Sequence, residues 1–272
     1  MTTAVPSPIC NVFSPTTGHG SVVQTHVVGL FKAVSIFSKQ YNNNALIVYI
    51  TERMFLWLLL LWFSQLACII AMNSSTIYVF AYSWTPGFCI GQTYPGCASP
   101  LDYWKNNFTI HGLWPQYDTT GYPSSCTNEP FNPSVPTEVG LDTMVMRWPD
   151  VKYDVNIPNY DSFWEHEWTK HGTCSGLSQY DYFAAAIALS SVLITPDLIN
   201  ESIGKNVNAD LLRTSIAPAA SVSLQCNHQQ LVGIYTCWNQ NENMPANLVE
   251  CPADVMQEDT CRATDEVYIP EL

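Results

Sequence analysis

Positive charge is scarce in this sequence. Its 272 residues include 10 Lys or Arg and 23 Asp or Glu, which gives a formal net charge of -13 at pH 7. Sequence-independent affinity for nucleic acid grows with the number of phosphates that Lys and Arg neutralise, so this composition excludes a protein that coats polyanions. It fits a protein that touches few phosphates. It also predicts that the protein works best in mildly acidic conditions, where carboxylates lose negative charge, histidines gain positive charge and repulsion of an anionic ligand is reduced.

Common metal-binding patterns are also absent. No two cysteines have the Cys-x-x-Cys spacing of structural zinc sites. His166 and His171 are five positions apart, whereas a zinc protease helix needs its two histidine ligands at i and i+4. We therefore expect no metal and no cofactor. The sequence has no internal repeat, and the roughly two hundred residues after its one long apolar run predict a single sizeable domain.

The apolar run, residues 54–72, carries no charge. Its length lies between that of a signal-peptide core, about 7 to 15 residues, and that of a membrane span, about 20. We expect a secretory signal peptide, with residues 1–53 as an upstream extension that is disordered or outside the mature protein. The alternative is an uncleaved signal anchor, in which case the protein is attached to a membrane and the basic residues before the run orient residues 73–272 outward. Both interpretations export residues 73–272.

Eight cysteines follow the apolar run. An even number in an exported domain predicts four disulfides, although spacing alone leaves the pairing open. Three N-glycosylation sequons, at Asn73, Asn107 and Asn200, agree with export. We expect the protein outside the cell or in the lumen of an acidic organelle such as a lysosome or vacuole.

The pattern after residue 73 predicts mixed α and β structure. Segments rich in β-branched and aromatic residues predict strands over 76–84, 108–110, 231–238 and 266–269. The Ala-rich segment 180–193 predicts a helix, and the Pro- and Gly-rich segment 117–136 predicts a long loop.

Two histidine motifs lie about sixty residues apart, namely Phe108-Thr-Ile-His111-Gly-Leu-Trp114-Pro and Phe163-Trp-Glu-His166-Glu167-Trp-Thr-Lys170-His171-Gly-Thr-Cys174. Cleavage of RNA by its own 2′-hydroxyl needs a base for that hydroxyl and an acid for the leaving 5′-oxygen. Histidine suits both roles because its ordinary pKa of about 6.5 makes both protonation states accessible. The phosphate also needs a fixed cation. We expect His111 and His171 to be the proton-transfer pair and Lys170 to be the cation.

The second motif predicts a helix. Ser162 and Glu165 have capping-box spacing, and Gly172 stands where a helix C-terminus favours glycine. In a helix, the spacing of Glu167, Lys170 and His171 puts their side chains on one face. His166 lies about 140° around the helix from His171, so it borders the same site.

Both motifs resemble the two active-site segments of the ribonuclease T2 family, and the resemblance covers about residues 77–272. It implies an α+β fold with a central antiparallel sheet flanked by helices. It also implies a monomeric endonuclease that cleaves single-stranded RNA through a 2′,3′-cyclic phosphate and forms no stable nucleic-acid complex.

The resemblance implies roles for the site residues as well. His171 would be the base and His111 the acid, while Glu167 and Lys170 would stabilise the transition state. Three further residues would bind the substrate, namely His166 at the phosphate and Trp114 and Tyr122 at a base. Gln116 stands where other members carry an Asp or Asn that contacts the base, which leaves the base preference open.

The cysteines resemble the family pattern too. This implies the pairs Cys89–Cys97, Cys126–Cys174, Cys226–Cys261 and Cys237–Cys251. One family disulfide is missing, because Gly96-Cys97 replaces the adjacent cysteine pair of many plant members.

Three other functions compete with this interpretation. A catalytically silent binding or storage protein can share a fold with an enzyme, but loss of a motif histidine would be its signature. A ribonuclease of self-incompatibility type is disfavoured by the acidic composition. A metal-dependent hydrolase is disfavoured by the histidine spacing.

Overall fold

The computed structural model describes residues 76–157, 160–261 and 266–272. They lie in one compact unit that runs from Ser74 to Leu272. The expected extension 1–53, the apolar run 54–72 and the sequon at Asn73 lie outside the described residues. In the part of the chain that is described, no helix is long and apolar enough to cross a membrane.

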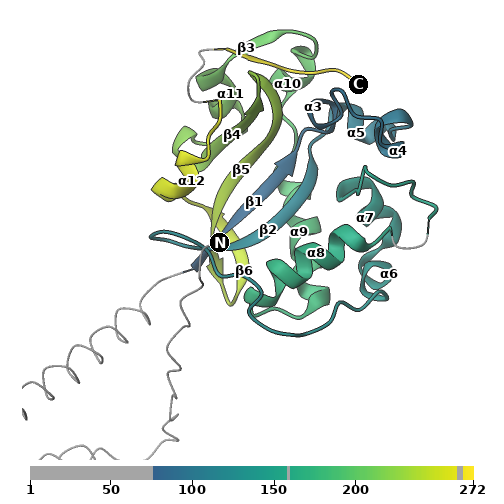
Figure 1. The fold of residues 1–272 in the computed structure, drawn as a ribbon. Coiled ribbons are helices and arrows are strands. Elements are labelled where there is room, and N and C mark those ends of the chain that lie inside the picture. The colour runs from purple at the N-terminus through teal and green to yellow at the C-terminus, as the bar shows by residue number, and fades with distance from the viewer. Residues whose placement is uncertain (1–75, 158–159, 262–265) are drawn as a thin grey trace, which may run out of the picture. The chain divides into compact units, whose positions relative to one another are not determined.

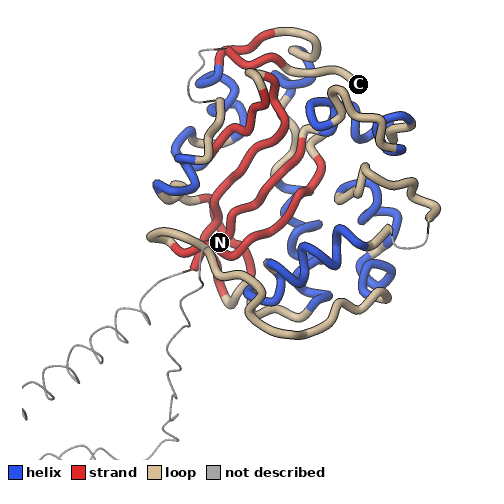
Figure 2. Tube along the Cα trace, in the orientation of Figure 1, coloured by secondary structure: helices blue, strands red, loops and turns tan. Residues whose placement is uncertain are grey.

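A seven-stranded sheet forms the centre of the described residues (Figures 1 and 2). Its strands are β1 (Thr76–Ser83), β2 (Thr109–Tyr117), β3 (Asn206–Asn208), β4 (Val222–Asn227), β5 (Gln230–Asn241), β6 (Met244–Leu248) and β7 (Glu266–Tyr268). The order is β2-β1-β5-β7-β3, and β4 and β6 also pair with β5. Every pair of these strands is antiparallel except β5 with β7, which is parallel.

Helices flank the sheet on two sides. Helices α7 and α9 contact β2, whereas α11 and α12 contact β4 (Figure 1). The helices are α3 (Thr85–Phe88), α4 (Pro95–Ala98), α5 (Asp102–Asn106), α6 (Val135–Val139), α7 (Leu141–Arg147), α8 (Ser162–Lys170), α9 (Gln179–Val192), α10 (Asp197–Glu201), α11 (Ala209–Ile216) and α12 (Ala253–Gln257), with short 3-10 turns η1 (Gly172–Cys174) and η2 (Ala219–Ser221). The predicted α+β fold is confirmed.

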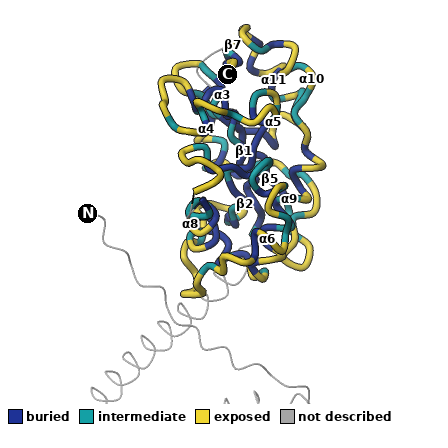
Figure 3. The backbone as a smooth tube through the Cα atoms, turned by 90° about the vertical axis from the view of Figure 1, so that its right-hand side faces the viewer, coloured by how far each residue is buried: buried dark blue, intermediate teal, exposed yellow. Residues whose placement is uncertain are grey.

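Strand β1 is buried on both faces, which explains its unbroken apolar sequence. One face carries Tyr78, Phe80 and Tyr82 into the main core. The other carries Ile77 and Val79 into a smaller core. The buried residues run through the middle of the molecule between exposed outer segments (Figure 3). The core is therefore built around a strand that is covered on both sides.

Four disulfides join the eight cysteines that follow the apolar run, and the pairs are those that the resemblance implied: Cys89–Cys97, Cys126–Cys174, Cys226–Cys261 and Cys237–Cys251. The second ties the long loop after β2 to the turn that follows α8. The last two tie the segment that contains α12 to β4 and β5. One link thus anchors the end of the second histidine motif, and two anchor the segment that contains α12.

Three local predictions were wrong. The strand expected over 108–110 continues to Tyr117, because β1 offers it partners along its whole length. Helix α8 is capped by Asp161 without a side-chain hydrogen bond, so Ser162 and Glu165 form no capping box. Gly172 starts a 3-10 turn instead of ending the helix in the left-handed region. Glycine is required there because a Cβ would collide with the ring of Trp168.

Candidate active site

His111 enters the site through an irregularity in the β1–β2 pairing. Ala81 pairs with Gly112 and Tyr82 with Ile110, so His111 is the extra residue of a β-bulge. A bulge re-aims the side chain that it carries. As a result the His111 ring lies edge-on to Trp114, with ring centroids 5.1 Å apart. The indole nitrogen of Trp148 donates to the His111 carbonyl at 2.9 Å and holds the bulge in place.

His171 follows directly after α8 and is almost fully buried, with 4% of its surface exposed. Its backbone N–H donates to the Glu167 carbonyl at 3.0 Å. Its ring stacks on Trp114, with centroids 5.1 Å apart and planes 24° from parallel. Its Nδ1 is the buried side-chain polar atom without a hydrogen-bond partner in the described chain.

Trp114 connects the two motifs. Besides touching both histidines, its Nε1 donates to Glu167 Oε2 at 2.8 Å. The Gly112 position requires glycine, because a Cβ there would collide with both atoms of that hydrogen bond. Tyr235 of β5 packs edge-on against the indole at 5.3 Å. The tryptophan is therefore the residue around which His111, His171 and Glu167 are arranged.

Glu167 is 1% exposed. Burial raises its pKa to about 8, although the Trp114 hydrogen bond and the Lys170 ammonium both act in the opposite direction. The carboxyl therefore holds a proton at neutral pH and can donate a hydrogen bond to an anion.

The histidines shift the other way. Burial, reinforced by the charges of Lys170 and His166, lowers the pKa of His171 to about 3. Burial and the charges of His166, Lys170 and Lys152 lower the pKa of His111 to about 4. The pKa of His166 is also lowered, first by partial burial and then by Lys170 and Lys152. The site thus resists additional positive charge until an anion enters.

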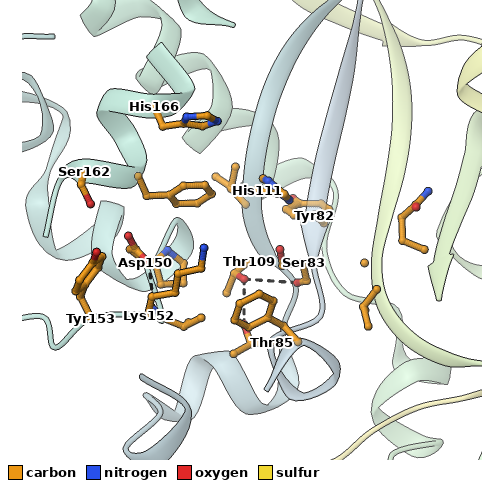
Figure 4. Close-up of a pocket in the computed structure, with 18 of the residues that line it drawn as sticks. Tyr82, Ser83, Thr85, Thr109, His111, Asp150, Lys152, Tyr153, Ser162 and His166 are labelled. Carbon is orange, nitrogen blue, oxygen red and sulfur yellow. Dashed lines mark hydrogen bonds between the residues drawn. The ribbon is translucent and has the colours of Figure 1, made fainter. Parts of the chain in front are cut away.

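A cavity of about 600 Å³ opens beside His111. His166 and Phe163 of α8 line it together with Lys152 and Asp150 from the preceding loop (Figure 4). The Phe163 ring lies 5.6 Å from that of His111. The cavity is large enough for a nucleotide-sized ligand.

Two cations of the described residues, Lys152 and Lys170, have no side-chain hydrogen bond or ion pair. Both act electrostatically on His111 and His166. The other described cations are engaged elsewhere, by carboxylates, carbonyl oxygens or a hydroxyl: Lys105, Arg147, Lys205 and Arg213. Among the described residues, the unpaired positive charge is therefore concentrated at one site.

Two of the residues expected near the base, Tyr122 and Gln116, differ in exposure. Tyr122 is 51% exposed, and its ring lies 6.3 Å from that of His171. Gln116 is 6% exposed, and its Nε2 donates to Asp254 Oδ2 at 3.0 Å. Gln116 lies two residues after Trp114 on β2, so both side chains are on the same face of the strand.

The described sequons differ too. Asn200 is exposed on α10. Asn107 is half-buried and donates to the Tyr103 carbonyl at 3.1 Å, while Thr109 of the same sequon is buried. Glycosylation of either residue stays a prediction.

Several site residues escaped sequence reasoning. Lys152, Tyr235 and Asp254 come from segments without a motif. Only the fold brings Lys152 and Tyr235 to the cavity beside His111 and Asp254 to Gln116. Phe163 is part of the second motif, and that position was the available signal for its place beside the cavity. Among the described residues, no three His, Cys, Asp or Glu side chains are grouped so that they could hold a metal ion.

Comparisons with known proteins identify the family of the chain. Residues 75–251 match the model of the ribonuclease T2 family. Ribonuclease 1 of Arabidopsis thaliana is 31% identical over 198 residues, which cover 64% of this chain and 79% of that protein. A ribonuclease-like storage protein of Panax ginseng is 30% identical over 204 residues, 67% of this chain and 78% of that protein.

A solved structure is similar as well. A mutant of ribonuclease MC1 in complex with 5′-GMP matches with a TM-score of 0.55 and 25% identity, over 71% of this chain and 99% of that one. The chain therefore belongs to the ribonuclease T2 family and is an enzyme, an endonuclease that acts on RNA.

Proposed function

We propose that this enzyme cleaves single-stranded RNA by transphosphorylation, with His171 as general base and His111 as general acid. His171 takes the proton of the 2′-hydroxyl, the 2′-oxygen attacks phosphorus, and His111 protonates the leaving 5′-oxygen. The products are a 2′,3′-cyclic phosphate and a free 5′-hydroxyl. The observation that carries the proposal is Trp114, which contacts both histidines and the buried Glu167 at once.

The charges of the site indicate activity at acidic pH. Burial lowers the pKa of both histidines, so neither is charged at neutral pH before substrate binds. An incoming phosphate raises both pKa values, because an anion favours the charged form of a histidine. As the pH rises above the pKa of His111, its acid form is lost. We therefore expect an acidic optimum and a rate that falls toward pH 8.

Glu167 and Lys170 are proposed to stabilise the phosphorane. A protonated Glu167 donates a hydrogen bond without adding a negative charge, and Lys170 supplies the nearest unpaired cation. Both groups act where negative charge develops.

The cavity beside His111 suits the leaving nucleotide. Because His111 protonates the 5′-oxygen of that nucleotide, the residues that line the cavity next to His111 should contact the same nucleotide. His166 and Lys152 are proposed to bind its phosphates, and Phe163 to pack against its base. On the other side, the exposed ring of Tyr122, together with Trp114, is proposed to hold the upstream base.

The remaining features of the chain are proposals as well. A signal peptide over 54–72, export, glycosylation and a monomeric catalytic domain over 73–272 agree with one another and with four disulfides, which persist in oxidising compartments. The amino-terminal sequence and mass of the purified protein test them together.

The decisive experiment is digestion of a short single-stranded RNA near pH 5 with EDTA present, followed by mass spectrometry of the product ends. Ends that carry a 2′,3′-cyclic phosphate are expected. Linear 3′-phosphate from the start of the reaction, or cleavage that EDTA abolishes, would contradict the mechanism. If folded, oxidised protein leaves the RNA intact, the silent storage interpretation takes its place.

A further inference from the structure

Asp254 lies on α12, far from both motifs in sequence, yet it forms hydrogen bonds to the segment between Gln116 and Tyr122. Its Oδ2 accepts a hydrogen bond from Gln116 Nε2 at 3.0 Å and another from the Gly121 N–H at 2.6 Å. The Tyr117 N–H donates to the Gly121 carbonyl at 3.0 Å and closes the turn between them. Tyr122 follows this turn directly. One carboxylate oxygen thus fixes Gln116 and the residue that precedes Tyr122.

The helix that carries Asp254 is itself fixed. Cys251 before it and Cys261 after it are bonded to β5 and β4, respectively. Val255 is 3% exposed and packs in the small core with Ile77 and Val79 of β1. Asp254 is therefore presented from a rigid element, which is what accurate positioning of a binding group requires.

This contact determines which way the Gln116 amide faces. A carboxylate only accepts hydrogen bonds, so Nε2 must be the atom beside Asp254, and Oε1 points away from it. Oε1 makes no hydrogen bond within the described residues. Among these residues, the one buried side-chain polar atom without a partner is His171 Nδ1. Gln116 Oε1 has no partner either, so it is not fully buried and is accessible to solvent. A fixed acceptor is thereby offered on the strand face of Trp114.

We propose that Asp254 is a positioning residue that determines the base preference of the enzyme. By holding Gln116 Oε1 as an acceptor, it favours an upstream base with an exocyclic amino donor, as in adenine, cytosine and guanine, over uracil, which has none. The inference rests on the proposed cleavage of RNA at this site. Asp254 also lies beyond the residues that match the family model, 75–251.

The test compares kcat/KM on four dinucleoside phosphates that differ in the upstream base alone. The wild type is expected to disfavour uracil, and Asp254→Asn is expected to reduce this discrimination roughly tenfold, mainly through KM. The pH profile should not move, because neither histidine is touched. Glu250→Gln is the matched control, since it removes one negative charge at an exposed position before the same helix.

A second variant separates positioning from general stability. Gln116→Met removes the amide and should change the base ratios as Asp254→Asn does. The double variant should change them no further, because both act through one group. Thermal unfolding confirms that each variant is folded, and if Asp254→Asn is not, Gln116→Met alone tests the base ratios.

Each other outcome contradicts the inference. Equal rates on all four wild-type substrates, base ratios that the variants leave unchanged, a uniform loss on all four, or the same change in Glu250→Gln would each overturn the role of Asp254. Lack of cleavage by the wild type would instead overturn the proposed function, and this inference with it.

Discussion

The two sides of the active site are built differently. On one side, His171, Trp114 and Glu167 pack against one another, and two of the three are almost completely buried. On the other side, His111 and His166 border a cavity together with Lys152. His171 and Glu167 of the packed side both contact the Trp114 indole. On the open side, His111 touches the edge of that indole from a β-bulge, and His166 is placed by helix α8.

This difference separates two tasks. Burial raises the pKa of Glu167 and lowers that of His171 on the packed side, and it also lowers the pKa of His111 at the edge of the open side. The other groups of the open side, His166 and Lys152, line the cavity that a long, charged substrate can enter. Changes on the packed side and at His111 should therefore affect chemistry and pH dependence, and changes at the other residues of the open side should affect binding.

Loss of either histidine should have the largest effect. His111→Ala and His171→Ala should each lower kcat by at least about 10²- to 10⁴-fold, because each removes one proton-transfer partner. The double variant should be about as inactive as either single variant, since the pair acts as a unit. Single-turnover rates on a short RNA measure this. Retention of activity by either folded variant would refute the assignment.

The packed side depends on Trp114. Trp114→Phe removes the indole hydrogen bond to Glu167 and should lower kcat about tenfold to a hundredfold, because the misplaced groups lie at the reacting phosphate. Trp104→Phe is the matched control, since it removes a comparable indole bond, to the Met146 carbonyl at 2.9 Å, away from the site. If the two variants lose the same amount of activity, Trp114 has no special role in arranging the site.

The open side should respond to the loss of Lys152. Lys152→Ala should raise KM several-fold with little change in kcat. It should also reduce the slope of log(kcat/KM) against log salt by about 0.7, as expected for one phosphate contact to a single strand. Lys105→Ala removes the same charge at a position paired with Asp102. An unchanged salt slope in the Lys152 variant would remove this residue from the RNA path.

The smallest effect concerns stability. The pKa of Glu167 rises from its ordinary 4.5 to about 8 in the folded protein. Between these values the folded state keeps a proton that the unfolded state has lost, so stability falls as the pH rises from 4.5 toward 8. Glu167→Gln cannot ionise and escapes this loss. Its unfolding free energy relative to wild type should therefore rise by more than ~1 kcal/mol between pH 5 and pH 8.

Chemical denaturation at the two pH values measures the difference. Glu250→Gln, which changes an exposed carboxylate, is the control. If both variants show the same pH dependence, Glu167 does not carry the buried proton.

Sequence reasoning succeeded where periodicity and residue type are strong. The first strand was expected over 76–84 and observed as Thr76–Ser83, and the long helix was expected over 180–193 and observed as Gln179–Val192. It failed at boundaries that tertiary pairing decides. The strand of the first motif was expected to end at residue 110, but pairing with β1 continues it to Tyr117.

For the candidate site, the sequence identified several residues but not the contacts among them. The motifs identified His111, Glu167, Lys170 and His171 as a group, because their residue types and spacing suit one reaction. Nothing in either motif indicated that Trp114 would contact both histidines and donate to Glu167. Such contacts depend on the β2 bulge and on the packing of α8. Both features result from interactions among residues that are far apart in the sequence.

Composition and motifs by themselves determined the mixed α and β content and the even set of cysteines, and the resemblance of the two motifs indicated the ribonuclease family, since these depend on residue types and local spacing. The tertiary structure alone decided the protonation of Glu167, the unpaired state of Lys152 and the link from Asp254 to Gln116. Burial, electrostatic field and orientation arise when segments far apart in the chain meet, so no local pattern encodes them.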